Sequence, residues 1–91
     1  EYQTFARQIY PGRFLVEGDT GPEVTLLQTQ LNRLAQRDRA LPSVTADGIF
    51  GPATAAAVRT LQSRLGYSTT GAVGPVLWSY IITQGQGYGV F

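Results

Sequence analysis

A five-residue pattern, Gly-x-x-Gly-Pro, occurs three times in this chain and constrains its fold more than any other feature. The copies cover residues 18–22, 48–52 and 71–75. The first Gly permits the positive φ that a sharp turn requires. The second Gly stands where a helix cap belongs, and Pro at the first helical position sacrifices no hydrogen bond, because that amide has no partner within a helix. Each copy therefore predicts a turn followed by a helix.

Apolar residues recur at helical spacing after the first two copies, which predicts helices over residues 22–37 and 52–65. The first stripe consists of Val24, Leu27, Leu31 and Leu34. The second consists of Thr54, Val58, Leu61 and Leu65. Gly66 follows directly and is expected to end the second helix. Both helices contain the element Leu-Gln-x-x-Leu, in which Gln28 and Gln62 lie at the edge of the buried face. Their amides either donate to a ligand or satisfy backbone groups of the turns.

A third, shorter helix is predicted over residues 75–83, with Trp78 among its core residues rather than as a platform for ligand. The chain has 91 residues, which favours one domain. We therefore expect an all-α fold, a compact three-helix bundle with a Gly-x-x-Gly-Pro turn before each helix, over residues 18–83. Residues 1–17 are expected to form an N-terminal arm that holds a short helix and packs on the bundle. Residues 84–91 are expected to be a Gly-rich C-terminal tail.

The charge balance disfavours nucleic acid as a partner. The net charge is +1, whereas nucleic-acid binders usually carry a clear basic excess. No stretch approaches the roughly 20 apolar residues of a membrane span. The chain shows no basic and apolar leader, so an export signal, if the parent protein has one, is expected outside this segment.

The side chains that usually carry catalysis are scarce in this sequence. The chain contains neither His nor Cys, so a Ser-His or Cys-His pair and thiolate or imidazole metal ligands are absent. Asp19 and Asp47 are the only carboxylates that invite comparison with a glycosidase pair. Because each lies beside a Gly ahead of a helix, we expect both to order their turns. We therefore predict no catalytic residues, no metal, no cofactor and no enzymatic activity.

Three blocks of sequence follow one another at a specific spacing. The first is Gly18-Asp19-Thr20-Gly21 with Leu27-Gln28 and Leu31, the second is Asp47-Gly48-Ile49-Phe50-Gly51 with Ala57-Val58 and Leu61-Gln62, and the third is Gly71-Ala72-Val73-Gly74 with Trp78. In this order they resemble a bacterial peptidoglycan-binding domain of the type often attached to cell-wall hydrolases. The resemblance covers residues 17–82. One departure is Thr70, where the family often has Asp before the first Gly of the third block.

The resemblance implies a function that composition and periodicity do not show. It implies an exported, cell-wall-associated module that binds peptidoglycan, through either its glycan or its stem peptide, and anchors a covalently linked enzyme or wall protein. The alternative is a structural or protein-protein interaction domain that has kept the fold without wall binding.

A shallow groove between the second and third helices is the predicted ligand site. Arg59 and Gln62 share one face of the second helix because they are three residues apart. Tyr67 follows that helix, and Tyr80 on the third helix is expected to approach the same region. The planar guanidinium of an arginine can bind a peptide carboxylate through two parallel hydrogen bonds. A tyrosine, with an apolar ring and a polar hydroxyl, suits a half-exposed position. The alternative is a solvated helix flank without a ligand.

Overall fold

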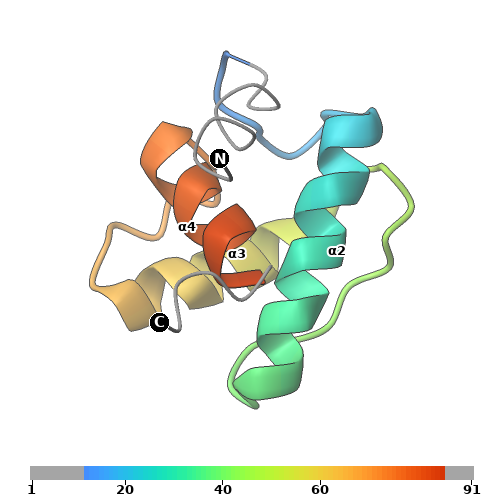
Figure 1. Cartoon of the computed structure of the whole chain (residues 1–91). Coiled ribbons are helices and arrows are strands. Elements are labelled where there is room, and N and C mark those ends of the chain that lie inside the picture. The colour runs from blue at the N-terminus through green and yellow to red at the C-terminus, as the bar shows by residue number, and fades with distance from the viewer. Residues whose placement is uncertain (1–11, 86–91) are drawn as a thin grey trace.

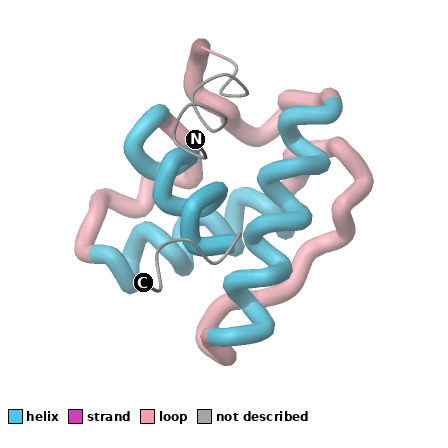
Figure 2. Tube along the Cα trace, in the orientation of Figure 1, coloured by secondary structure: helices cyan, strands magenta, loops and turns pink. Residues whose placement is uncertain are grey.

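The computed structural model describes residues 12–85, which form the predicted all-α bundle of three helices. The helices are α2 (Pro22–Arg37), α3 (Pro52–Leu65) and α4 (Pro75–Gly85). The backbones of α2 and α4 approach each other closely, and α3 crosses behind them (Figure 1). Long loops connect the helices (Figure 2). Within residues 12–85, no helix combines the length and the apolar character needed to cross a membrane. The short N-terminal helix expected within residues 1–17 has no counterpart in the described part of that segment, and residues 1–11 lie outside it.

The Gly-x-x-Gly-Pro pattern places the helix starts as predicted. The first Gly of each copy has a positive φ, which is 106° at Gly18 and 78° at both Gly48 and Gly71. Gly21 and Gly51 are the N-caps of α2 and α3, and a Pro occupies the first turn of each helix. At the other end of α3, Gly66 adopts the left-handed conformation with a φ of 81°. Local backbone chemistry therefore sets both ends of α3.

Helix α4 continues to Gly85, two residues beyond the predicted end at residue 83. Gln84 and Gly85 were expected in the C-terminal tail, and the structure places them in the helix. Gly85 is buried against α2, where an added Cβ would lie 3.1 Å from Cα of Gln30. Arg37 of α2 also donates to the carbonyl of Gln84. Packing on α2 thus outweighs the weak helix propensity of glycine.

The predicted apolar stripes form the core. Leu31 and Leu61 are 2% and 3% exposed, whereas Leu26 is only partly buried at the edge of the cluster. Trp78 is fully buried, which confirms that it belongs to the core. The largest apolar side chains that are fully buried come from α2, from α4 and from the segments that precede α2 and α3: Trp78, Phe50, Leu15, Leu27, Leu31, Ile81 and Ile82.

Extended segments ahead of the helices pair with one another in two places. Leu15 and Val73 exchange both backbone hydrogen bonds as an antiparallel bridge, at 3.0 and 2.9 Å. Thr20 and Ile49 form a second antiparallel bridge. The first bridge brings the segment before α2 against the turn before α4, with Leu15 buried in the core. The N-terminal segment therefore forms part of the bundle surface near the start of α4.

Candidate functional site

Gln28 of α2 holds the turn that precedes α3. Its side chain is 1% exposed. Its Nε2 donates to the carbonyl of Ile49 at 2.9 Å and to Oγ1 of Thr54 at 3.0 Å, with Oδ1 of Asp47 at 3.3 Å. Its Oε1 accepts from the backbone N–H of Gly48 at 2.9 Å. The amide thus satisfies polar groups that the fold removes from water.

Gln62 of α3 holds the next turn in the same way. Its Nε2 donates to the carbonyl of Ala72 at 3.2 Å and to Oγ1 of Thr70 at 3.1 Å. Its Oε1 accepts from the backbone N–H of Gly71 at 2.9 Å. Of the two interpretations of these glutamines, the contacts support the one in which their amides satisfy the turns.

The residue ahead of each of these glycines caps the turn through its side-chain oxygen. Oδ1 of Asp47 accepts from the N–H of Ile49 at 3.0 Å, and Oγ1 of Thr70 accepts from the N–H of Ala72 at 3.2 Å. In the turn before α4, Thr70 therefore accepts the hydrogen bond that Asp47 accepts in the turn before α3. It differs in having no charge and in carrying a hydroxyl hydrogen.

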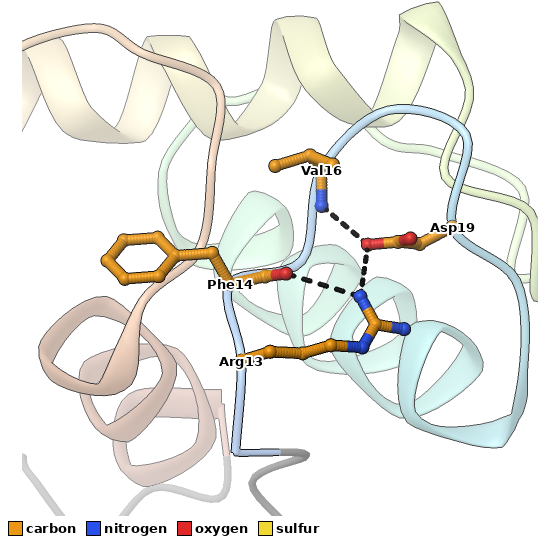
Figure 3. Close-up of polar contacts among 4 residues, drawn as sticks. All are labelled: Arg13, Phe14, Val16 and Asp19. Atoms are coloured by element: carbon orange, nitrogen blue, oxygen red, sulfur yellow. Dashed lines mark hydrogen bonds and ion pairs between the residues drawn. The ribbon is translucent and has the colours of Figure 1, made fainter.

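Asp19 orders the first turn. Its Oδ2 accepts from the backbone N–H of Val16 at 2.8 Å and from Arg13 at 3.0 Å (Figure 3). The hydrogen bond from Val16 is the main reason that the pKa of Asp19 lies below its ordinary value of 3.8, with partial desolvation opposing and Arg13 adding to the shift. The backbone N–H of Ile49 likewise lowers the pKa of Asp47, against desolvation and with help from Gln28. Both aspartates are turn-ordering carboxylates, as predicted.

A mostly apolar groove of about 430 Å³ lies between the end of α3 and the start of α4, which we call the Phe14–Tyr67 groove. Its lining is Phe14, Gln62, Tyr67, Thr70, Ala72, Gly74, Pro75, Val76 and Leu77. Three of these side chains are conspicuously exposed: Phe14 at 59%, Tyr67 at 48% and Val76 at 70%. The Phe14 ring turns away from Asp19 in Figure 3 and lies over Gly74, where an added Cβ would be 2.5 Å from Cε2 of the ring. The lining contains no charged side chain.

A second hollow, of about 310 Å³, is polar and lies near the ends of α2 and α4. We call it the Arg37–Arg64 hollow, and its lining is Leu34, Arg37, Asp38, Leu41, Leu61, Arg64, Leu65, Tyr80 and Gln84. Nε of Arg64 pairs with Oδ2 of Asp38 at 2.6 Å. Arg37 donates to the carbonyl of Gln84. Both arginines therefore already have oxygen partners.

The structure divides the four predicted ligand residues between different places. Gln62 and Tyr67 both line the Phe14–Tyr67 groove, whereas Tyr80 lines the Arg37–Arg64 hollow. Arg59 lines neither; its side chain lies over Gly71, where an added Cβ would be 2.9 Å from Nη1. Phe14 also lines the groove, although it was not among the residues predicted for this site. The alternation of exposed Phe14, buried Leu15 and exposed Val16 is the local signal that marks Phe14 as outward-facing.

Comparison with known proteins first defines the fold. The crystal structure of the SleB N-terminal domain matches with a TM-score of 0.68 at 22% identity, over 84% of this chain and 97% of that domain. An uncharacterised protein from the region 3′ of bpoA1 in Kitasatospora aureofaciens is 42% identical over 71 residues. That match covers 77% of this chain and only 56% of the relative's length.

The family follows from the sequence model described as "Putative peptidoglycan binding domain", which matches residues 20–81. The matched span contains all three Gly-x-x-Gly-Pro turns except the first two residues of the first copy. This chain therefore belongs to the peptidoglycan-binding domain family.

Proposed function

We propose that this chain is a non-catalytic module that binds peptidoglycan and anchors an attached enzyme or wall protein at the bacterial cell wall, outside the cytoplasm. The observation that carries the proposal is the family match over residues 20–81. The module's partners are the wall polymer and the covalently linked domain of the parent protein.

The lowered pKa values of the two turn aspartates, Asp19 and Asp47, support a role without catalysis. A glycosidase needs one carboxyl group that keeps its proton near neutral pH, which requires a raised pKa. Asp19 and Asp47 instead accept backbone N–H groups, and their pKa values are lowered. Such groups are ionised at neutral pH and are committed to the turns. A binding role fits these turns better than proton transfer does.

The wall contact is proposed at the surface near the end of α3. Tyr67 is half exposed there, and Gln62, whose amide is used by the turn before α4, lines the same groove. Arg59 is exposed and makes no hydrogen bond or ion pair with the described residues, so its guanidinium is available to a peptide carboxylate. Tyr80 lines the Arg37–Arg64 hollow and not the groove, so it is proposed as a separate contact.

Cosedimentation with purified peptidoglycan sacculi tests this function. We expect the folded chain to sediment with sacculi and to stay in solution with cellulose, an insoluble glycan without stem peptides. Arg59→Ala and Tyr67→Ala, checked by circular dichroism, should reduce retention. Equal recovery of the unmodified chain on sacculi and on cellulose would favour the structural or protein-interaction alternative.

A further inference from the structure

We propose that the Phe14–Tyr67 groove binds an uncharged N-acetylated sugar of the glycan strand, and that the Thr70 hydroxyl donates a hydrogen bond to it. This inference rests on the proposed function and names the part of peptidoglycan that this groove recognises. It assigns the stem peptide no contact in the groove.

The charge of the groove favours sugar over peptide. Stem peptides carry free carboxylates, which bind best to a guanidinium or ammonium group. None of the residues that line the groove is charged. The arginines of the Arg37–Arg64 hollow already have partners in Asp38 and the Gln84 carbonyl. A neutral ligand therefore matches the groove, and the C–H face of a sugar ring matches its exposed aromatic side chains.

Both aromatic residues are held by backbone contacts rather than by loose loops. The bridge between Leu15 and Val73 fixes the residue next to Phe14. The backbone N–H of Tyr67 donates to the carbonyl of Gln62 at 2.9 Å, directly after the left-handed Gly66. A surface whose backbone is already ordered loses less conformational freedom when it binds. The backbone that carries each of the two rings is thus ordered before a ligand binds.

Thr70 contributes a donor that the equivalent turn lacks. A threonine hydroxyl has two acceptor sites and one hydrogen. The acceptor sites of Thr70 are used by Nε2 of Gln62 and the N–H of Ala72, at 3.1 and 3.2 Å. Among the described residues, its hydrogen has no acceptor, and the residue is exposed in the groove lining. The hydrogen is therefore free to bond a sugar hydroxyl or an acetamido carbonyl, which ionised Asp47 in the second turn is unable to do.

Binding of two separate probes to the whole chain tests the inference. The probes are peptide-free glycan strands from amidase-treated sacculi and a synthetic stem tetrapeptide, each titrated into labelled protein by NMR. We expect the glycan to shift the amide signals of the groove residues and the tetrapeptide to leave them unchanged. Loss of one stacking ring should weaken glycan binding about tenfold, so Phe14→Ala and Tyr67→Ala should each do so.

Substitutions at Thr70 distinguish its proposed role as a donor to the sugar from its role as an acceptor within the turn. Thr70→Asp keeps the acceptors for the turn and removes the hydrogen, so the fold should persist while glycan affinity falls about three- to tenfold. Thr70→Ser keeps the acceptors and the hydrogen, so it should bind glycan more tightly than Thr70→Asp does. Ile49→Ala is the matched control, because Ile49 is 55% exposed and lies outside the groove lining.

The outcomes distinguish this inference from the proposed function. Sedimentation with sacculi that survives both Phe14→Ala and Tyr67→Ala overturns the groove assignment and leaves wall binding intact. Groove shifts with the tetrapeptide, and none with peptide-free glycan, also overturn it. If the unmodified chain fails to sediment with sacculi, the proposed function is wrong and the inference falls with it.

Discussion

Single buried amides join elements that are distant in the sequence. Gln28 and Gln62 each accept from the N–H of a turn glycine and donate to the carbonyl of the following residue. Because the groups they satisfy are partly or fully removed from water, each amide is worth more than an exposed hydrogen bond. At the residue scale, these two side chains position the turns before α3 and α4.

Loss of the Gln28 amide should strongly destabilise the fold. Gln28→Ala leaves the N–H of Gly48 and the hydroxyl of Thr54 without their partner, so we expect a loss of about 2–3 kcal/mol in the free energy of unfolding. Urea denaturation measures it. Gln36→Ala is the control, because Gln36 is an exposed residue of the same helix. Similar midpoints for the two variants would contradict the role of Gln28.

The turn aspartates should make the fold sensitive to acid. Their folded-state pKa values lie below the ordinary value of 3.8. Their contribution to stability is therefore complete above about pH 4 and is lost as the pH falls through the lower, folded-state pKa. We expect the denaturation midpoint to fall on acidification below pH 4. The double variant Asp19→Asn, Asp47→Asn should show a shallower fall, and an equally steep one would argue against these groups.

Helices of this bundle are stabilised mainly by their buried faces. The apolar residues that recur at helical spacing in α2 are buried in the core. Side chains of α3 and α4 belong to the same core cluster. The close backbone approach of α2 and α4 depends on Gly85, which leaves room for Gln30. At the element scale, packing thus decides both stability and the end of α4.

Truncation of leucines to alanine should show which face of each helix is buried. Leu31→Ala and Leu61→Ala should each destabilise the fold by about 2–5 kcal/mol, because both side chains are almost fully buried. Leu26→Ala should cost less, since Leu26 packs only at the edge of the core. If the denaturant midpoints rank Leu26→Ala as the most damaging of the three, the assignment of the buried helix faces is wrong.

Gly85→Ala should destabilise the chain, although alanine is the better helix former. At an open helical position the change would stabilise by about 0.5–1 kcal/mol. Here the new methyl group would lie 2.8 Å from Cβ and 3.1 Å from Cα of Gln30, so overpacking should cost about 1–3 kcal/mol. Ser79→Ala, at an exposed position of α4, is the control. A higher thermal midpoint for Gly85→Ala would exclude the close contact.

The whole molecule joins three turn-and-helix units with an N-terminal segment that completes one surface. The Leu15–Val73 bridge carries Phe14 to the start of α4, so the groove combines a residue ahead of α2 with residues 62–77. The resulting surface is a shallow groove with an uncharged lining, and the carboxylates of the turns hold backbone N–H groups.

The chain alone should not hydrolyse cell walls. Its sequence holds no His or Cys, and both turn aspartates are expected to stay ionised at neutral pH. Suspensions of purified walls should therefore keep their turbidity after addition of the protein. Clearing by the unmodified chain that Asp47→Asn abolishes would assign catalysis to that carboxylate.

Local signals in the sequence determined the three turns, the starts of all three helices and the ends of α2 and α3. Positive φ at glycine, proline in the first turn and apolar spacing act within a few residues, so they do not depend on the rest of the fold. The burial of Trp78 also followed from its spacing in a helix. Membership of the family was recognisable for the same reason, because its blocks consist of these turns and stripes.

Tertiary structure alone decided the partners of those elements. The end of α4 depends on a contact between Gly85 and Gln30, and the role of Gln62 depends on where the next turn lies. Tyr80 and Tyr67 line different hollows because helix packing, rather than spacing, sets the direction of each side chain. Phe14 reaches the groove only through the pairing of Leu15 with Val73. Contacts between segments distant in sequence depend on the packed arrangement of the whole chain, which no local pattern specifies.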